Sequence, residues 1–279
     1  MRPTLQLHEE LLAAANSLEP LPTATVQLAT LVNDPSATPS EIAAVIGTDP
    51  ALAAHTLRDA NSAIQGVRTP VGSLDQAVVR LGAARVLEIA MRAHLDDRIA
   101  ADLPCYGIGG DAHRAQAVGA SIAAEVLVRH SAVTIGNDVL CAALLHDLGK
   151  EVIDAVADPA TADLLQAADV VDLEFEQEVV EADHAEIGAF VLESWHLPPS
   201  LVDAVRHHHH PAHSPEAATV CLAEGLCAEL LPDGDVAIAI DPARIDAAAA
   251  TLGIADRLDT VRLEVAAALR DAGLVDTID

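Results

Sequence analysis

Apolar residues recur at intervals of three and four along most of the chain, which is the spacing of helices that bury one face. In the first hundred residues, proline, glycine and short polar stretches break this pattern repeatedly, so the helices that it predicts are short. Ser73 stands where a helix N-cap is expected, with Gln76 at the capping-box position. These predicted helices span residues 4–18, 23–33, 39–47, 50–61, 74–81 and 83–95.

The stretch 102–111 contains Pro104 and three glycines, and it is the clearest boundary in the chain. A second break, rich in Gly, Asp and Pro, falls at 232–242, and Val236 to Ile240 is the one strand candidate. The expected units are therefore residues 1–101, 102–231 and 232–279. The later predicted helices are longer and span residues 112–130, 137–147, 159–169, 174–195, 199–209, 215–231, 243–252 and 255–272.

Composition supports an all-α fold. Alanine makes up about a fifth of the residues, whereas aromatic residues make up 1%. Alanine is the best helix former and is depleted in strands. The hydrophobic share of 51% is large enough for a sizeable core.

The charge balance excludes some partners. The chain has 43 acidic and 15 basic residues, a net charge of −28. Because such a surface repels phosphate backbones and anionic lipids, we expect no binding to nucleic acid or membranes. The acidity fits either solubility and salt tolerance or the docking of a basic partner.

Cysteine usage and the N-terminus bear on the compartment. The four cysteines show no CxxC spacing and three lie in apolar stretches, which is typical of reduced core residues. We find no signal peptide and no apolar run long enough for a membrane span. These features predict a cytoplasmic protein.

The candidate chemistry centres on the adjacent residues His146 and Asp147. They place an imidazole nitrogen beside a carboxylate oxygen, and one divalent cation can bind both. The pair alone fits equally well the end of an apolar helix with Gly149 as its C-terminal cap. Further candidate ligands favour a metal site, because His113 lies in the preceding helix and His184 lies downstream.

Four consecutive histidines, 207–210, end the helix predicted at 199–209. Counting by three and four from its apolar residues places His208 and His209 on or beside the buried face, and the outer two point outward. Glu224 lies on the apolar stripe of the next helix, where a carboxylate is costly unless it is paired, bound to metal or at the helix edge. The remaining isolated histidines, among them His213, are expected to be surface or packing residues.

The order His113, His146-Asp147, His184, His208-His209 and then a carboxylate is similar to that of the HD superfamily of metal-dependent phosphohydrolases. The surrounding motifs resemble one branch more closely, the HDOD domain (HD-related output domain), and extend over roughly residues 18–231. Those motifs are Leu21-Pro22, Asn33-Asp34-Pro35, Ile46-Gly47-Thr48-Asp49-Pro50-Ala51-Leu52, Ala60-Asn61-Ser62, Ala77-Val78-Val79-Arg80-Leu81-Gly82, His184-Ala185-Glu186-Ile187-Gly188-Ala189 and Trp195-His196-Leu197-Pro198.

The resemblance implies a small N-terminal helical bundle, residues 1–101, packed on an HD-like bundle, residues 102–231, with a C-terminal helical extension. It also implies a bacterial signalling role, with a signalling protein or a nucleotide as partner. Most members are thought to have lost some metal ligands, whereas this chain keeps the histidines and Asp147. One or two divalent ions (Mn, Fe, Mg or Zn) are therefore expected, bound less well below a pH of about 6.

Two residues bear on catalysis. Glu224 stands where an Asp is usual in catalytic HD domains, and its longer side chain changes the reach of the carboxylate. Lys150, the single lysine of the chain, lies where related catalytic domains contact a phosphate. With Asp147, it is the candidate catalytic residue.

Three functions remain open. The favoured one is a signalling or scaffold module that binds metal. The alternatives are a metal-dependent phosphohydrolase, acting on a nucleotide or cyclic dinucleotide through a metal-activated water, and a sensor that holds a nucleotide without turnover. The sequence carries no prediction of oligomeric state.

Overall fold

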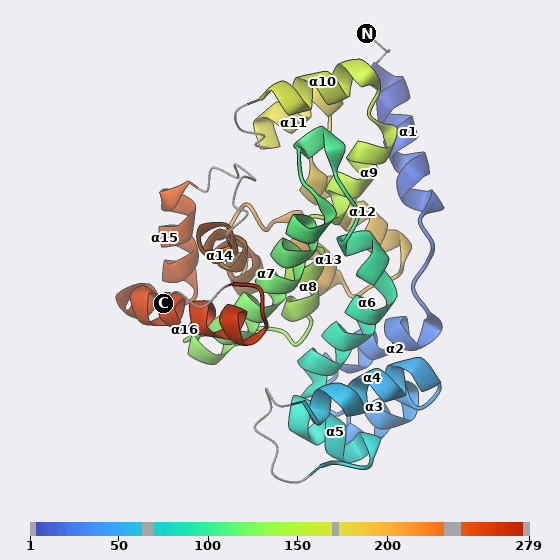
Figure 1. Cartoon of the computed structure of the whole chain (residues 1–279), viewed down its shortest axis with the longest axis vertical. Coiled ribbons are helices and arrows are strands. Elements are labelled where there is room, and N and C mark those ends of the chain that lie inside the picture. Colours follow the sequence, from blue (N-terminus) through green and yellow to red (C-terminus); the bar gives the residue numbers. More distant parts are fainter. Residues whose placement is uncertain (1–3, 63–69, 169–172, 232–240, 276–279) are drawn as a thin grey trace.

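The computed structural model describes residues 4–62, 70–168, 173–231 and 241–275. The described residues form helices throughout, which confirms the all-α prediction (Figure 1). Their nearest approach to a strand is an isolated antiparallel bridge between Leu103 and Ile108. The strand candidate at Val236 to Ile240 lies outside the described residues.

The described part of the first hundred residues contains six helices, five of them within two residues of the predicted ranges. These are α1 (Thr4–Ser17), α2 (Thr23–Leu31), α3 (Pro39–Ile46), α4 (Pro50–Ala60), α5 (Leu74–Leu81) and α6 (Ala83–Ile99). Local capping explains the short lengths. Thr38 and Glu41 form a capping box at the start of α3, and the side chains of Asp49 and Ser73 accept hydrogen bonds from the first-turn N–H groups of α4 and α5.

The second half contains the helices that carry the candidate site. They are η2 (Pro104–Tyr106), α7 (Gly110–His130), α8 (Val139–Leu145), α9 (Leu148–Val156), α10 (Pro159–Ala167), α11 (Leu173–Val180), α12 (His184–Ser194), α13 (Pro199–Arg206), α14 (Pro215–Leu230), α15 (Pro242–Thr251), η3 (Ala255–Arg257) and α16 (Leu258–Asp271). Helices α2 to α5 gather at one end of the molecule, and α6 runs from them toward α8 (Figure 1). Helix α1 instead packs against α9 and α12.

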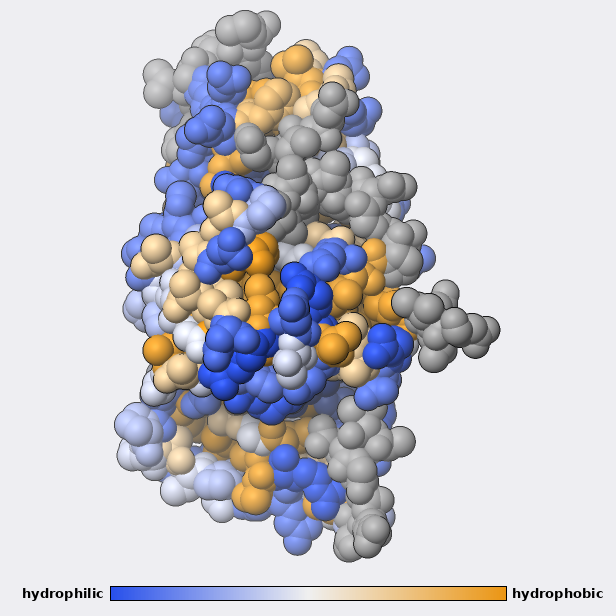
Figure 2. Space-filling view, turned by 90° about the vertical axis from the view of Figure 1, so that its left-hand side faces the viewer, coloured by the Kyte–Doolittle hydropathy of each residue, from blue (hydrophilic) through white to orange (hydrophobic). Residues whose placement is uncertain are grey.

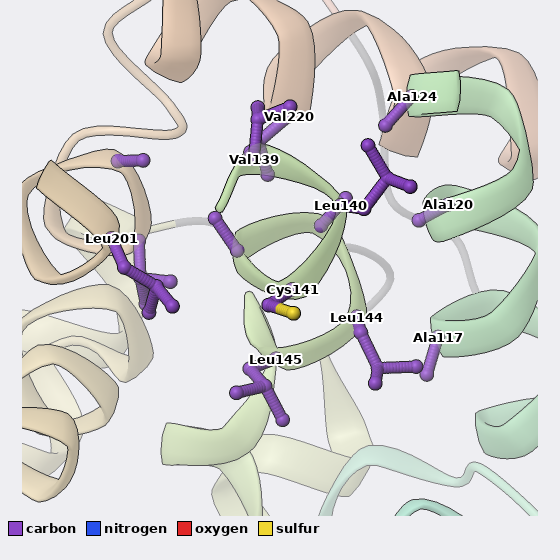
Figure 3. Close-up of a cluster of buried hydrophobic side chains, with 14 of the residues drawn as sticks. Ala117, Ala120, Ala124, Val139, Leu140, Cys141, Leu144, Leu145, Leu201 and Val220 are labelled. Atoms are coloured by element: carbon purple, nitrogen blue, oxygen red, sulfur yellow. The ribbon is translucent and has the colours of Figure 1, made fainter. Parts of the chain in front are cut away.

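Helix α8 is the centre of the core. Every residue from Val139 to Leu145 is buried, and the helix packs against α6, α7, α13 and α14. Figure 3 shows its side chains pointing in several directions, toward Ala120 and Ala124 on one side and Leu201 on another. A helix that is apolar all round must lie inside the protein, and small alanines on α7 allow its backbone to approach closely.

Polar contacts link the N-terminal helices to the second half. The buried Asp138 carboxylate accepts hydrogen bonds from Asn33 Nδ2 at 2.7 Å and from Ser200 Oγ at 2.5 Å. Asn137 Nδ2 donates to the carbonyl of Val32 at 2.7 Å. Helices α6 and α7, on either side of the boundary predicted at 102–111, also pack together.

Several predicted helices have different bounds: the one predicted at 83–95 continues to Ile99, and α9 was not predicted. The helix predicted at 137–147 stops at Leu145, and the chain continues after His146-Asp147 as α9, so Gly149 is an inner residue of a helix and not a cap. The helix predicted at 174–195 is divided into α11 and α12, since Asp183 caps α12 by accepting from Glu186 N. The helix predicted at 199–209 ends at Arg206, before the histidine run.

The cysteines and the surface bear on two further expectations. All four cysteines are buried and free. On the face formed by α15 and α16, hydrophilic residues are interspersed with smaller apolar areas (Figure 2). Among the described helices, none has the length and apolar content that crossing a membrane requires.

Candidate metal centre

His146 and Asp147 occupy the break between two helices in the core. His146 follows the last turn of α8, Asp147 precedes the first turn of α9, and both side chains are buried. The break is what allows consecutive side chains to face the same space, because neighbouring residues within one helix point in different directions. The Asp147 carboxylate lies 3.4 Å from Nε2 of His146.

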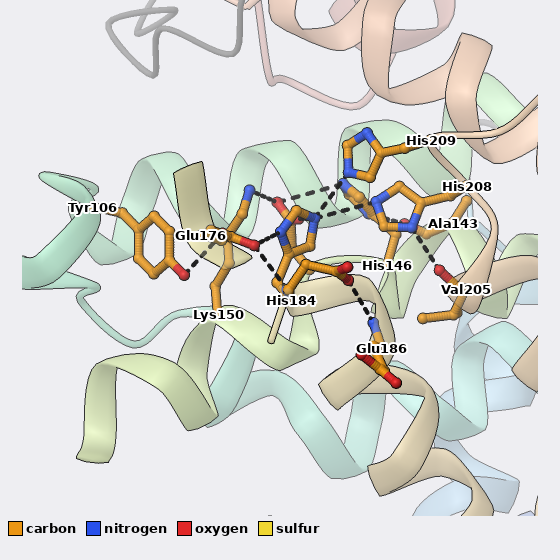
Figure 4. Close-up of polar contacts among 12 residues, drawn as sticks. Tyr106, Ala143, His146, Lys150, Glu176, His184, Glu186, Val205, His208 and His209 are labelled. Carbon is orange, nitrogen blue, oxygen red and sulfur yellow. Dashed lines mark hydrogen bonds and ion pairs between the residues drawn. The ribbon is translucent and has the colours of Figure 1, made fainter. Parts of the chain in front are cut away.

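Three further histidines meet this pair. His184 is the first residue of α12, and its Nε2 lies 3.4 Å from Asp147 Oδ1. His208 and His209 follow the end of α13, and their Nε2 atoms lie 3.4 and 3.0 Å from Nε2 of His184 (Figure 4). The predicted burial of His208 and His209 is confirmed, although a turn beyond the helix places them, not the helical face.

The outer nitrogens of four histidines are fixed by acceptors. Because a carbonyl or a carboxylate only accepts, each Nδ1 carries the proton, and Nε2 of the neutral ring keeps its lone pair. Metal-binding histidines in proteins are held in this way. The Nδ1 atoms of His113, His146 and His208 donate to the carbonyls of Ala101, Ala143 and Val205 at 3.1, 2.8 and 2.6 Å, and Nδ1 of His184 donates to Glu176 Oε2 at 2.8 Å.

Glu176 and Tyr106 form an outer polar layer that the sequence reasoning missed. Glu176 Oε2 accepts from both the backbone N–H and Nδ1 of His184, each at 2.8 Å, and Oε1 accepts from the Tyr106 hydroxyl at 3.0 Å. Burial lowers the pKa of His184, but the Glu176 carboxylate outweighs burial and the net shift is upward. Glu176 is one of the buried residues of α11 together with Val180, at helical spacing, and this is the same signal that identified Glu224.

Lys150 supplies the positive charge of the site. Its Nζ donates to Asp147 Oδ2 at 2.8 Å, and both side chains are buried. Burial alone raises the pKa of Asp147, but His146 and Lys150 outweigh it and hold this pKa well below its ordinary value. Asp147 is therefore a carboxylate at neutral pH, with Oδ2 on the lysine and Oδ1 facing His184.

Glu224 and His113 complete the predicted set. Both are buried, and both interact electrostatically with Asp147, Lys150 and His146. Burial raises the pKa of Glu224 and lowers the pKa of His113. The structure thus brings all eight predicted site residues into one buried region, on α7, the α8–α9 break, α9, α12, the turn after α13, and α14.

Three atoms of this region test its fit to a metal ion. Within the described part of the chain, His146 Nε2, Asp147 Oδ1 and Glu224 Oε1 are buried without a hydrogen-bond partner. Leaving such groups unpaired is costly, and cations bound in this region would offer them partners. The buried ligand atoms that lie within 4.8 Å of one another belong to His184, His208 and His209. Imidazole nitrogen together with carboxylate oxygen suits Mn, Fe and Zn. The donor set therefore fits the divalent metal that the family resemblance implies.

A second group of polar side chains, Asp203 on α13 with His207 and His213 after it, lies at the surface. Asp203 accepts from Nε2 of His213 at 2.8 Å, and the rings of His207 and His213 stack with centroids 3.8 Å apart. His213 is exposed, as the sequence suggested, but it has a partner there. These residues could offer ligand atoms to a cation as well, so experiments on the buried centre must separate the two groups.

Sequence comparison places the chain in a known family. The profile of the HDOD domain matches residues 18–211. A curated relative, an uncharacterized protein of Treponema pallidum (strain Nichols), is 25% identical over 218 residues, which cover 76% of this chain and 42% of that protein. The chain thus spans about two fifths of the length of that curated relative.

Solved structures share the fold. A candidate phosphohydrolase from Shewanella amazonensis SB2B is similar with a TM-score of 0.67 and 25% identity, covering 96% of this chain and 98% of that one. An HDOD domain protein with unknown function from Geobacter sulfurreducens has a TM-score of 0.71 and 19% identity, covering 96% and 97%. With the profile match extending over most of the chain, the predicted relationship is confirmed: this chain belongs to the HDOD domain family.

Proposed function

We propose that the chain is a regulatory HDOD module that binds a divalent metal ion in the centre of its second helical bundle. The observation that carries the proposal is the set of histidine rings whose Nδ1 atoms are held from outside, which leaves Nε2 free for a cation. Its partner would be a signalling protein or a nucleotide. The strongly acidic composition argues against nucleic acid and anionic membranes.

The residues that would hold the ion fall into two groups. His146, Asp147 and Glu224 offer the three buried atoms that have no hydrogen-bond partner among the described residues. Nε2 of His184 lies 3.4 Å from Asp147 Oδ1 and 3.4 Å from Nε2 of His208, and His113 is a buried residue of α7. When bound, such an ion acts as a Lewis acid or fixes the elements that carry its ligands.

Metal analysis of the full chain, purified without an affinity tag, tests this proposal. We expect close to stoichiometric divalent metal in the parent protein and none in the variant His146→Ala, Asp147→Ala, because that variant removes adjacent nitrogen and oxygen ligands. The control is His213→Ala, which disrupts only the surface group and should leave the buried ion in place. Metal that survives the double substitution but is lost in the His213 variant would place the ion at the surface and contradict the proposal.

A phosphohydrolase is the second candidate, and Lys150 favours it. A buried ammonium beside a ligand carboxylate can stabilise negative charge that develops on a phosphate. The resemblance to the Shewanella amazonensis candidate phosphohydrolase is consistent with this activity. Glu224 weighs against it, because a longer carboxylate within the packed α14 can fill the position that a nucleophilic water requires.

We therefore expect metal binding with slow or absent phosphodiester hydrolysis. The assay is turnover of an activated phosphodiester and of cyclic dinucleotides with added manganese, for the parent and for Glu224→Asp. The matched control is Glu229→Asp, the same shortening on the exposed side of α14. Robust turnover by the parent, lost in Asp147→Ala, would show an enzyme and overturn the assignment as a purely regulatory module.

A further inference from the structure

His209 differs from the other histidines of the site in the partner of its outer nitrogen. Its Nδ1 lies 3.1 Å from Nη1 of Arg244, on α15. A guanidinium only donates hydrogen bonds, so Nδ1 of His209 accepts. In the other four rings Nδ1 donates to an oxygen. The neutral His209 ring therefore carries its proton on Nε2, the nitrogen that faces the centre.

The donor and acceptor roles of the neighbouring histidine, His184, fit a proton on Nε2 of His209. Nε2 of His209 lies 3.0 Å from Nε2 of His184, whose own proton is on Nδ1 and is donated to Glu176. His184 thus accepts at Nε2 what His209 donates. Each hydrogen bond in the series from Arg244 through His209 and His184 to Glu176 therefore has one donor and one acceptor. Figure 4 shows the part of this series formed by His209, His184 and Glu176.

We propose that Arg244 is a positioning residue that keeps His209 as a hydrogen-bond donor and prevents it from serving as a metal ligand. To bind metal through Nε2 while Arg244 donates to Nδ1, the ring would have to lose its only proton and become an anion. If His184 held an ion through Nε2, the N–H of His209 would lose its acceptor and would be free to donate to an anion bound at the site. This inference rests on the proposed function and adds which residue would contact the anion.

Arg244 lies outside the part of the chain that the HDOD profile matches. The HDOD profile ends at residue 211, whereas Arg244 lies on α15, which packs against α14, the helix that carries Glu224. The C-terminal helices thereby reach the buried site through the Arg244 side chain. A guanidinium behind the imidazole also places positive charge where an anion would bind.

Nitrogen NMR of the histidine rings in the metal-free protein tests the tautomer directly. We expect His209 to be protonated at Nε2 in the parent and in Arg244→Lys, since lysine also only donates. In Arg244→Glu the new carboxylate accepts from Nδ1, and the proton should move to that nitrogen. The control Arg270→Glu makes the same charge change at an exposed position of α16 and should leave His209 unchanged. A parent ring protonated at Nδ1, or an unchanged ring in Arg244→Glu, would overturn the proposal.

Metal and anion binding give a second readout. Freed of its Nε2 proton, His209 in Arg244→Glu should become a ligand, so this variant should bind metal more tightly than the parent. Its metal-loaded form should bind inorganic phosphate about tenfold more weakly, because a charge-assisted hydrogen bond is lost. If the parent binds no metal but its tautomer responds as expected, the proposed function fails and the role of Arg244 stands. If metal binds and the tautomer does not respond, only the role of Arg244 is wrong.

Discussion

The variant Gly149→Ala should be destabilised by about 3 kcal/mol, at the upper end of the usual cost of overpacking a core. A Cβ atom added to Gly149 would lie 1.9 Å from the carbonyl oxygen of His184 and 2.8 Å from the backbone nitrogen of Gly188. Both are backbone atoms, so no side-chain rotation can relieve the overlap. Helices α9 and α12 would have to separate, which would move His184 away from Asp147.

Two matched glycines make the measurement interpretable. Gly72 has open space where a Cβ would stand, so Gly72→Ala should unfold at nearly the same denaturant concentration as the parent. In Gly188→Ala the added atom would lie 3.2 Å from Gly149 N, a much milder contact. In equilibrium denaturant unfolding, Gly72→Ala should therefore be the most stable of the three variants, Gly188→Ala intermediate and Gly149→Ala the least stable. A Gly149 variant as stable as the Gly72 variant would show that α9 and α12 are not in close contact.

The helices were predictable because their ends are encoded locally. The Thr38, Asp49 and Ser73 caps are short-range signals, and each starts a helix as expected. The break at His146-Asp147 was not predictable in the same way. The apolar pattern runs through it, and the close approach of Gly149 to the backbone of α12 joins distant parts of the chain, which no local pattern encodes.

The sequence identified which residues form the candidate site but not how their side chains are arranged. Histidines and acids on apolar faces identified the residues that converge, since burying such groups is costly without a partner. Glu176 escaped notice because 174–195 was predicted as one helix, which would have carried it away from His184. Arg244 had no local signal at all, because its contact with His209 joins α15 to a turn after α13.

These missed residues share a role that sequence patterns do not encode. Glu176 and Arg244 act on the outer nitrogens of His184 and His209, Glu176 by accepting a hydrogen bond and Arg244 by donating one. Whether the partner accepts or donates decides whether Nε2, the nitrogen that faces the centre, carries a lone pair or the proton. The chemistry of the site thus depends on residues that lie one layer outside it.

The variant Glu176→Ala should lose about 3 kcal/mol of stability and bind metal about 10- to 100-fold more weakly. It removes the acceptor of three hydrogen bonds and leaves the backbone N–H and Nδ1–H of His184 buried without a partner. His184 is then free to rotate away from Asp147. Glu178→Ala is the matched control, because it removes the same side chain from the exposed side of α11 and should change stability by less than about 0.5 kcal/mol.

The variant Glu176→Gln separates the contribution of the carboxylate charge from that of a side chain with the same shape. One amide oxygen can still accept from His184, and the Tyr106 hydroxyl can turn to accept from the amide, so the fold should be nearly unchanged. Burial raises the pKa of Glu176, but His184 outweighs burial and the net shift is below the ordinary value of 4.5. The stabilisation that the charge supplies is thus complete above about pH 5 and is lost as the pH falls through the lowered pKa. Unfolding curves should show the parent more stable than Glu176→Gln at neutral pH and the difference shrinking in acid; a difference independent of pH would mean that the carboxylate charge does not hold His184.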